Sequence, residues 1–318
     1  KKAMQGHPED IVPCLRCSNC YHISTDHWSV GCSVNPSYHH QDFVPPERDI
    51  IKAKKAKYVV IIGGGPAGMK AAITAYDRGH KVTLIEKEAE LGGMLRVIVK
   101  EGHKKEVRRL LHYYRTQIEK RDIEILLNTE ATPDMVRAFN PDSLLIALGA
   151  VEQILPIQGI QNSKVLLATD AINHPESLGQ KIVVLGGGSI GCEIALGLAE
   201  KEKDVTIIEI SDTLAGNANS LYREALRQKF LLHKNIKSLI KSSCSQIGEN
   251  EILYKDENDE ENRIAYDNLI LSTGLKSQND LVESFYEVCR DTVAIGDCIT
   301  PSSIMNANFE GYVNALNI

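Results

Sequence analysis

Several features are missing from this 318-residue sequence, and each absence excludes a class of function. Basic residues are not in excess: 36 lysines and arginines stand against 42 aspartates and glutamates, and the net charge of −6 argues against a nucleic-acid partner. No apolar run approaches the roughly 20 residues that a membrane-spanning helix requires. The N-terminus, KKAMQGHPED, has no apolar core of the kind found in signal peptides, so we expect a cytoplasmic protein with no membrane partner.

The composition that remains is that of an ordinary α/β protein, with 43% hydrophobic and 25% charged residues. The length predicts about two domains. The first residues resemble the end of a helix inside a longer protein, so we expect either a fragment of a longer chain or a separate subunit. A homo-oligomer is compatible with this composition.

The chain is organised around residues 58–68, which read YVVIIGGGPAG. An apolar run typical of a buried strand leads into a glycine turn and then into an alanine-rich helix, expected from Met69 to Arg78. In a dinucleotide-binding βαβ unit the first glycine permits the tight bend, the second lets the backbone approach a pyrophosphate, and the third lets the helix pack closely on the strand. These three positions are Gly63, Gly65 and Gly68.

The context favours this interpretation over a merely structural glycine turn. The next strand, expected from Lys81 to Ile85, ends in Glu86, and an acid about 20 residues beyond the glycines binds a ribose hydroxyl in such units. The amides at the start of the helix would face the phosphates. We therefore predict a first nucleotide site here.

The pattern recurs at residues 181–191, KIVVLGGGSIG, where the three glycines are Gly186, Gly188 and Gly191. The following strand, Val205 to Ile208, ends in Glu209. A carboxylate at this position favours the free 2′-hydroxyl of NADH and repels the 2′-phosphate of NADPH, and Ile210 stands where a cation could receive that phosphate. Two nucleotide sites in one chain predict hydride transfer between a nicotinamide and a flavin.

Half of the cysteines fall within one short stretch: Cys14, Cys17, Cys20 and Cys32. Three closely spaced cysteines and one more remote favour a [4Fe-4S] cluster, while a zinc ion and unligated thiols remain the alternatives. Disulfides are disfavoured in a reducing cytoplasm. The neighbouring histidines are expected at the surface or behind the ligands, and the single tryptophan is expected to cover the cluster; these residues are His22, His27, Trp28, His39 and His40.

The strings GHPEDIVPCLRCSNCYH and GCSVNP resemble the cluster segment of iron-sulfur flavoenzymes of the old yellow enzyme class, such as 2,4-dienoyl-CoA reductase, 2-enoate reductase and trimethylamine dehydrogenase. The resemblance implies FAD, NADH and a [4Fe-4S] cluster as cofactors. It also implies that electrons pass from NADH through FAD and the cluster to FMN, where an activated alkene such as an enoate or enoyl-CoA is reduced. In this class FMN lies in a TIM barrel before the cluster segment. Only thirteen residues precede Cys14, so FMN is expected in an upstream domain or a partner.

Two other interpretations stay open. The chain could be a stand-alone electron-transfer subunit that docks on a separate FMN protein, or a zinc-containing flavoprotein without a redox relay. No catalytic residue in the proton-transfer sense is expected, because the hydride step itself requires no acid or base side chain. Neither nucleotide unit carries the CxxC of disulfide reductases, and Cys192 and Cys244 are expected to be small buried residues.

The resemblance further implies which residues hold the FAD and close the two units. They are Met94 and Lys104 after the first acid, Ala131 beside the adenine, Gly149 and Gly274 at the ends of the closing strands, and Asp297, Asn306 and Ala307 near the C-terminus. Asp297, in TVAIGDC, matches the second FAD signature, which contacts the ribityl and pyrophosphate region. A helix from Ile304 to Leu316 would turn its N-terminus and the backbone of Asn306 and Ala307 toward the flavin.

We thus predict a protein of the α/β class with two doubly wound three-layer dinucleotide-binding domains. The NADH domain is inserted into the FAD domain, and a cysteine-rich iron-sulfur segment precedes both. The expected boundaries are 1–44 for the cluster segment, 45–56 for a linker, 57–160 and 275–318 for the FAD domain, and 161–274 for the NADH domain.

Overall fold

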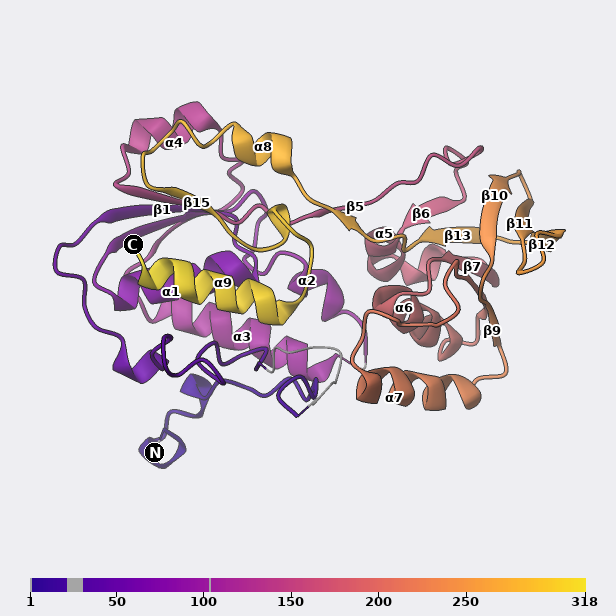
Figure 1. The fold of residues 1–318 in the computed structure, drawn as a ribbon, viewed down its shortest axis with the longest axis horizontal. Coiled ribbons are helices and arrows are strands. Elements are labelled where there is room, and N and C mark those ends of the chain that lie inside the picture. Colours follow the sequence, from indigo (N-terminus) through magenta and orange to yellow (C-terminus); the bar gives the residue numbers. More distant parts are fainter. Residues whose placement is uncertain (1, 22–30, 103) are drawn as a thin grey trace. The chain divides into compact units, whose positions relative to one another are not determined.

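The computed structural model describes residues 2–21, 31–102 and 104–318. The chain forms two compact units (Figure 1). The first unit combines Lys1–Val99, His103–Val151 and Lys276–Ile318, and the second combines Lys100–Gly102 and Glu152–Leu275. Within the described ranges, no helix has both the length and the apolar character needed to cross a bilayer.

The first unit is built on a five-stranded sheet in the order β15-β4-β1-β2-β3, in which every pairing is parallel. Its strands are β1 (Tyr58–Ile62), β2 (Lys81–Ile85), β3 (Glu124–Leu126), β4 (Ser143–Ile146) and β15 (Thr292–Ala294). The central strands β1 and β4 are almost wholly buried, as parallel strands covered on both faces must be. Ile62 pairs with both Ile85 and Ile146, so these strands end at the same edge, where the glycine turn begins.

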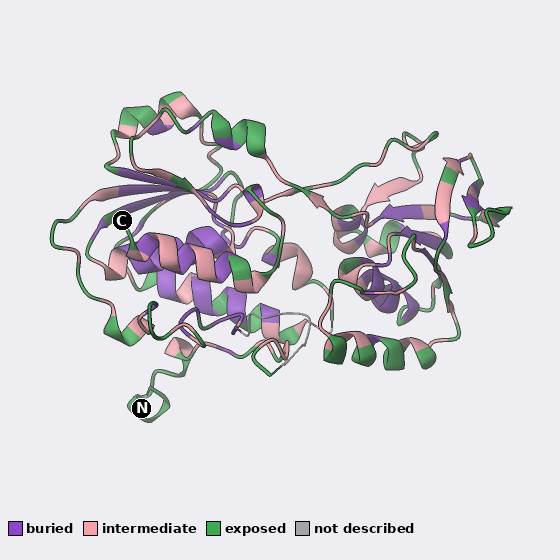
Figure 2. Cartoon of the chain, in the orientation of Figure 1, coloured by how far each residue is buried: buried purple, intermediate pink, exposed green. Residues whose placement is uncertain are grey.

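Successive residues of β1 face opposite sides of this sheet and define its two covering layers. Val59 and Ile61 belong to a core formed with α1 (Pro66–Asp77), α3 (Lys105–Glu119) and α9 (Ile304–Leu316). Val60 and Ile62 belong to a second core with α4 (Pro133–Phe139) and α8 (Asn279–Glu283). Figure 2 shows α1 as a largely buried helix and α9 as a helix that alternates buried and intermediate positions. The short helix α2 spans Leu95–Ile98.

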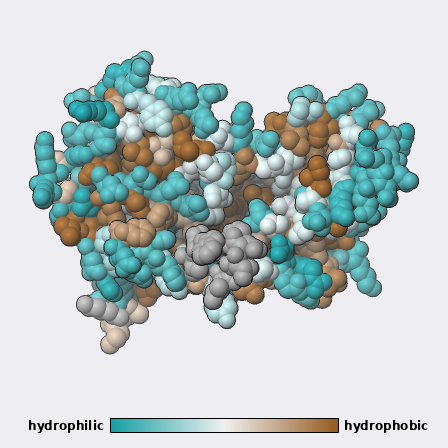
Figure 3. Space-filling view, in the orientation of Figure 1, coloured by the Kyte–Doolittle hydropathy of each residue, from teal (hydrophilic) through white to brown (hydrophobic). Residues whose placement is uncertain are grey.

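The second unit repeats the parallel sheet in the order β6-β13-β7-β8-β9. The strands are β6 (Val165–Leu167), β7 (Lys181–Leu185), β8 (Asp204–Ile208), β9 (Ile236–Leu239) and β13 (Asn268–Leu271). One core packs this sheet on α5 (Ala168–Asn173), α6 (Ser189–Ala199) and α7 (Ser220–Leu231). The surface over α7 is mostly hydrophilic in Figure 3, with the exposed side chains of Leu221 and Leu231 among charged residues such as Glu224 and Arg227, while Leu226 is buried.

The other face of this sheet is covered by an antiparallel sheet of β10 (Ser243–Ile247), β11 (Glu251–Lys255) and β12 (Glu261–Ala265). The core between them contains Ile247, Ile252 and Tyr254. Both units therefore have three layers, as the fold class predicted from the sequence requires.

Residues 152–160 pack with the second unit, whereas the sequence interpretation placed them in the first. Gln158 bridges to Gln246, and Ile157 and Ile160 join the core that contains Ile247. Gly159 approaches the Ile247 carbonyl so closely that an added Cβ would lie 1.9 Å from its oxygen. The chain leaves and re-enters the first unit through a two-stranded pairing of β5 (Val151–Glu152) with β14 (Leu275–Lys276).

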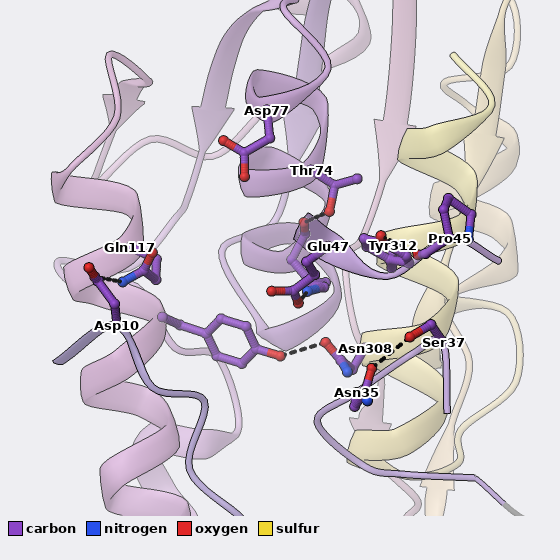
Figure 4. A network of polar contacts seen from close by, with 12 residues as sticks. Asp10, Asn35, Ser37, Pro45, Glu47, Thr74, Asp77, Gln117, Asn308 and Tyr312 are labelled. Atoms are coloured by element: carbon purple, nitrogen blue, oxygen red, sulfur yellow. Dashed lines mark hydrogen bonds and ion pairs between the residues drawn. The ribbon is translucent and has the colours of Figure 1, made fainter. Parts of the chain in front are cut away.

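The stretch expected to be a linker, residues 45–56, is held on the first unit by buried polar contacts (Figure 4). Lys70 of α1 is 3% exposed and forms an ion pair with Glu47, and its ammonium lies 4.8 Å from the centre of the Tyr312 ring. The Tyr312 hydroxyl donates to the Pro45 carbonyl at 2.7 Å. A buried lysine with its carboxylate partner on this stretch makes the stretch part of the fold.

Three short 3-10 helices, η1 (Ala3–Gln5), η2 (Pro8–Asp10) and η3 (Glu47–Asp49), mark the N-terminal segment. Lys120 of α3 pairs with Glu9 and with Asp10, each at 2.7 Å. Gln117 donates to Asp10 at 2.8 Å, as Figure 4 shows. The segment that leads to the first cysteines is thus anchored along α3.

Candidate functional site

The first glycine turn combines two positions that admit no side chain with one that faces open space. Gly63 has φ +100°, and a Cβ there would lie 2.2 Å from the Ala147 carbonyl oxygen. A Cβ on Gly68 would lie 1.9 Å from the Gly63 oxygen, so this glycine lets α1 approach β1. A Cβ on Gly65 would meet nothing within 4 Å. The turn therefore has a tight inner side and an open outer side at the N-terminus of α1, where anions bind.

The acid at the end of β2 lies directly beneath this turn. Glu86 is buried, and its carboxylate accepts hydrogen bonds from the amides of Gly64 at 2.6 Å and Glu88 at 2.9 Å. A carboxylate has about four lone-pair positions, so acceptor capacity remains for ribose hydroxyls. The structure thus places Glu86 and the glycine turn together, as their spacing predicted.

The loop at residues 91–94 covers the same turn. The Gly92 amide donates to the Gly64 carbonyl at 2.8 Å, and a Cβ on Gly93, where φ is +51°, would lie 2.9 Å from the Gly65 Cα. Met94 follows as the N-terminal cap of α2 and is 37% exposed. Met94 therefore lies beside the loop that covers the turn, and its contact with FAD stays a prediction.

Asp297 reaches the turn from the far end of the sequence. It lies in the 3-10 helix η5 (Gly296–Cys298), and the Cβ position of Gly296 is 3.1 Å from the Ala67 Cβ in the first turn of α1. Asp297 accepts from the Ser302 amide at 3.0 Å. Burial raises the pKa of this carboxyl group. A polar group held in a half-buried place beside a helix N-terminus is suited to contact a ligand there.

The start of α9 is capped by its own sequence. The Ser303 hydroxyl accepts from the Asn306 amide at 3.3 Å, and the Ala307 amide donates to the Ser303 carbonyl at 3.0 Å. The backbone amides of Asn306 and Ala307, expected to face the flavin, are thus engaged inside the helix. The amides of Ile304 and Met305, the first two residues of the helix, have no partner within the helix and lie closer to its tip.

The remaining residues implied for FAD binding lie further from the glycine turn in the chain. Lys104 is the N-terminal cap residue of α3. Ala131 packs beside the core that contains Ile62 and Ile85. Gly149, with φ +70°, ends the segment after β4, and its carbonyl accepts from the Gln278 side chain at 3.0 Å. Their contacts with a cofactor stay predictions.

The second glycine turn reproduces the first. Gly186 has φ +103°, and its Cβ would lie 2.3 Å from the Ser272 carbonyl oxygen. A Cβ on Gly191 would lie 2.0 Å from the Gly186 oxygen, just as a Cβ on Gly68 would lie 1.9 Å from the Gly63 oxygen. Gly188 is the N-terminal cap of α6 and has open space around its Cβ position, apart from the Asn217 Oδ1 at 3.9 Å. Gly274, with φ +103°, accepts from the Gln153 amide at 2.9 Å where the unit closes.

Glu209 occupies the position of Glu86 in this second unit. It accepts from the Gly187 amide at 2.5 Å and from the amide and hydroxyl of Ser211, both at 2.7 Å. Burial acts to raise the pKa of Glu209, but these donors outweigh it and the pKa lies below the ordinary glutamate value. Glu209 is therefore a carboxylate at neutral pH.

The fold also brings the backbone of a lysine beside the segment that follows this acid, which adjacent sequence positions did not indicate. Lys241 donates its amide to the Ser211 carbonyl at 2.9 Å, and its ammonium lies 3.6 Å from Glu257. The sequence interpretation, which considered only Ile210, missed it because Lys241 follows a different strand. The sequence feature that could have indicated Lys241 is its position just after β9, because β9 runs parallel to β8 and ends at the same edge of the sheet.

A second feature that sequence reasoning missed is the repetition of the covering loop. The Ala215 amide donates to the Gly187 carbonyl at 2.7 Å, as Gly92 does to Gly64. Leu214 lies over Gly187 as Leu91 lies over Gly64, each with a methyl carbon 2.5 Å from the glycine's Cβ position. The signal was present in the spacing, because LGGM begins five residues after Glu86 and LAGN five residues after Glu209.

The cysteine segment has the local structure of a ligand loop. Arg16 and Ser18, on either side of Cys17, have φ of +53° and +63°. The Arg16 amide donates to the Cys14 Sγ at 3.3 Å, and the Cys17 Sγ lies 3.1 Å from the Ser33 hydroxyl. Left-handed backbone at two non-glycine residues, with donors turned toward sulfur, fits a loop that wraps its thiolates around a metal centre.

The spacing of the thiols bears on the choice of metal. Four cysteines on one tetrahedral zinc ion would have sulfurs about 3.8 Å apart, given the usual Zn–S bond length. Among the described residues, the only group of three or more ligand side chains with donor atoms within 4.8 Å of one another is His7, Glu9 and Asp10. No three of the four cysteine sulfurs therefore all lie within 4.8 Å of one another. Lys120 pairs with both Glu9 and Asp10, so the acidic group is an ion-pair cluster.

The cysteine segment packs against the N-terminus of α9. A Cβ on Gly31 would lie 2.9 Å from the Met305 Sδ, and the Asn19 amide group lies 4.0 Å from the same sulfur. Arg16 pairs with Glu106 of α3, which raises the pKa of Arg16 and lowers that of Glu106. Residues next to Cys20 and Cys32 therefore contact the helix tip beside Asp297. His22, His27 and Trp28 lie outside the described residues.

Comparison with known proteins decides the family. The model of the family described as "Pyridine nucleotide-disulphide oxidoreductase" matches residues 57–311. The chain belongs to this family. The membership confirms an oxidoreductase and supports the pairing of FAD with NAD(H) across the two glycine-turn sites.

Longer relatives match most or all of the chain. It is 32% identical over 320 residues to cinnamate reductase of Clostridium sporogenes, covering 100% of this chain and 47% of that protein. It is 33% identical over 237 residues to NADH oxidase of Thermoanaerobacter brockii, covering 72% of this chain and 36% of that protein. The solved structure of 2-naphthoyl-CoA reductase matches with a TM-score of 0.93 and 31% identity, over 100% of this chain and 48% of that one. The chain thus spans about half, or less, of these relatives, and the resemblance to the old yellow enzyme class is confirmed.

Proposed function

We propose that this chain is the NADH-oxidising part of a flavin oxidoreductase that passes electrons from NADH through FAD and a [4Fe-4S] cluster to an FMN site. The FMN site lies in a domain or partner outside this chain and reduces an activated alkene such as an enoate or enoyl-CoA. The observation that carries the proposal is the repeated set of glycine turn, acid and covering loop, together with a four-cysteine segment packed on the first unit. The names cinnamate reductase, NADH oxidase and 2-naphthoyl-CoA reductase support the same chemistry.

FAD is assigned to the first unit. The open side of Gly65 admits the pyrophosphate, Glu86 receives ribose hydroxyls, and Asp297 borders the tip of α1. Those three residues come from separate parts of the sequence, and in the described part of this unit the cysteine segment contacts the start of α9, close to Asp297. The first unit is therefore the one in which a flavin and a metal cluster would be neighbours.

NADH is assigned to the second unit. Its carboxylate at Glu209 is held ionised by Gly187 and Ser211, so it accepts from a ribose 2′-hydroxyl and repels a 2′-phosphate. The backbone of Lys241 lies beside Ser211, but its ammonium is 3.6 Å from Glu257 and is therefore paired with another carboxylate. The balance favours NADH over NADPH.

Cys14, Cys17, Cys20 and Cys32 are assigned to the [4Fe-4S] cluster. Three closely spaced cysteines with a fourth at position 32, and the contacts of Cys14 and Cys17 with neighbouring donors, support this ligand set. When bound, FAD supplies two-electron chemistry with NADH and can release electrons singly, and the cluster carries one electron at a time. The chain's own contribution is to fix the ligand loop against Met305 at the tip of α9.

The test uses the FAD-loaded protein after anaerobic reconstitution with iron and sulfide. We expect four irons and four sulfides per chain, NADH-dependent reduction of ferricyanide, and no reduction of enoates by the chain alone, because FMN is absent. Stoichiometric zinc without sulfide would remove the relay from the proposal. Enoate reduction without FMN would place the substrate site in this chain and refute the division of labour.

The location of FMN separates two forms of the proposal. FMN sits either on the same polypeptide or on a separate protein on which this chain docks. An antibody raised against residues 104–318 and applied to an extract of the source cells distinguishes them. Detection of a polypeptide with about twice the mass of this chain indicates the first form, and detection of one with the mass of this chain indicates the docking subunit.

A further inference from the structure

The two nucleotide sites differ at one position of their covering loops. Both loops bond their backbone to the central glycine of the turn, through Gly92 in the first unit and Ala215 in the second. Two residues after these bonds the first loop carries Met94 and the second carries Asn217. Methionine offers no strong acceptor to a backbone amide, whereas asparagine does.

Asn217 uses that acceptor on the first turn of α6. Its Oδ1 accepts from the Ser189 amide at 3.1 Å and from the Ser189 hydroxyl at 2.8 Å. Ser189 is the first residue of α6, and the cap residue before it, Gly188, has no side chain to satisfy these donors. Asn217 therefore supplies a cap from another part of the chain.

The same donors are the ones that a pyrophosphate would use. The amides of a helix's first turn, with the positive end of the helix dipole, form the anion site of a dinucleotide-binding unit. In the second unit Asn217 Oδ1 lies 3.9 Å from the Cβ position of Gly188, whereas in the first unit nothing lies within 4 Å of the Cβ position of Gly65. The anion site of the first unit is therefore open, whereas that of the second unit is occupied by the side-chain oxygen of Asn217.

The backbone around Asn217 is fastened on both sides. Ala215 is 1% exposed and bonded to Gly187, and Asn219 accepts from the Tyr222 amide at 2.9 Å as the cap of α7. Two residues thus hold the loop at its ends. Release of the helix tip requires only that the Asn217 side chain rotate, which exposed side chains do on the picosecond to nanosecond timescale.

We propose that Asn217 sets the affinity of the second site, because its carboxamide oxygen competes with a phosphate oxygen of the nucleotide for the donors of Ser189. The inference rests on the proposed function, since it takes the second unit as the NADH site. The proposal explains why the two nucleotides would be held with different strength, as the proposed reaction requires. FAD stays bound through many turnovers in a site that is open to it, while NADH must enter and leave at each turnover and meets a competitor.

The test measures binding of ADP-ribose and of NADH to the FAD-loaded protein by calorimetry, with ADP-ribose chosen because it cannot reduce the flavin. Asn217→Ala removes the competitor, and we expect binding about three- to tenfold tighter, the equivalent of one released hydrogen bond. Asn217→Asp keeps an acceptor on Ser189 and adds a negative charge beside the pyrophosphate, so binding should become roughly tenfold weaker.

Asn219→Ala is the matched control, because it is the same substitution two residues away at the cap of a different helix. It should leave the affinity unchanged or weaken it. Opposite effects of the two Asn217 variants are a signature that simple damage to the loop cannot produce. If Asn217→Ala binds ADP-ribose as the parent does or more weakly, the inference is wrong, while the proposed function stands. If the parent binds neither nucleotide, the proposed function fails, and the inference fails with it.

Discussion

Replacement by alanine should affect the stability of the fold differently at Gly68 and at Gly65 in the first glycine turn. Alanine at position 68 places a Cβ 1.9 Å from the Gly63 carbonyl oxygen, and real Cβ atoms essentially never approach closer than 3.0 Å. The start of α1 must therefore move by more than 1 Å from β1. Overpacking of this kind costs about 3 kcal/mol at the upper end of its usual range. Alanine at position 65 meets nothing within 4 Å and keeps an allowed φ of −72°, so its cost is at most about 1 kcal/mol, mainly from a poorer cap.

The two variants should distinguish an effect on the stability of the fold from an effect on FAD binding. Thermal unfolding of the FAD-free protein is the first measurement, because bound FAD would itself raise the midpoint. At about 2–4 °C per kcal/mol, Gly68→Ala should lower the midpoint of the first unit by about 6–12 °C, and Gly65→Ala by about 4 °C or less. The second measurement is FAD titration. Gly65→Ala should weaken FAD binding by about tenfold or more, because its methyl group points to the side where the backbone approaches a pyrophosphate.

Either of two results would refute this reasoning. An unchanged midpoint in Gly68→Ala would mean that the close approach of α1 to β1 is not needed for the fold. Unchanged FAD affinity in Gly65→Ala would mean that the open side of the turn is not the side that binds the cofactor.

Three further perturbations test other parts of the account. Glu209→Ala should narrow the preference for NADH over NADPH in stopped-flow flavin reduction, and in the parent the preference should persist into mildly acidic solution because the pKa of Glu209 is depressed; equal rates in the parent would contradict the assignment. Cys17→Ser should abolish the iron-sulfur absorption and leave the FAD content unchanged, whereas joint loss of both would show that the segment is required for the fold. Glu47→Gln leaves Lys70 buried without its carboxylate and should lower the free energy of unfolding by about 1–3 kcal/mol in a urea titration, compared with little change for the exposed Glu224→Gln.

The sequence predicted the parts of the fold that depend on local pattern. The strand Lys81–Ile85 and the helix Ile304–Leu316 have the predicted bounds, because apolar runs and a serine cap determine them locally. The first helix begins at Pro66 rather than Met69, since proline is favoured in a helix's first turn and the glycine turn continues directly into it.

Features formed by distant contacts could not be predicted in the same way. The docking of residues 45–56 uses contacts with α1 and α9, such as the ion pair of Lys70 with Glu47 and the hydrogen bond of Tyr312 to Pro45, from a stretch with loop composition. The neighbourhood of Lys241 and Glu209 depends on where two parallel strands end. The contact between Gly31 and Met305 joins positions on opposite ends of the chain, and no periodicity in either segment indicates it.

The most direct test of the central claim is an anaerobic NADH titration of the FAD-loaded, cluster-reconstituted chain, followed by absorbance and electron paramagnetic resonance. The account predicts that NADH bleaches the flavin and that the signal of a reduced [4Fe-4S] cluster then appears. In Cys17→Ser the flavin should still bleach and ferricyanide reduction should continue, but the cluster signal should be absent. A parent protein in which NADH bleaches the flavin while a fully loaded cluster stays oxidised would contradict the claim that this chain carries electrons from one to the other.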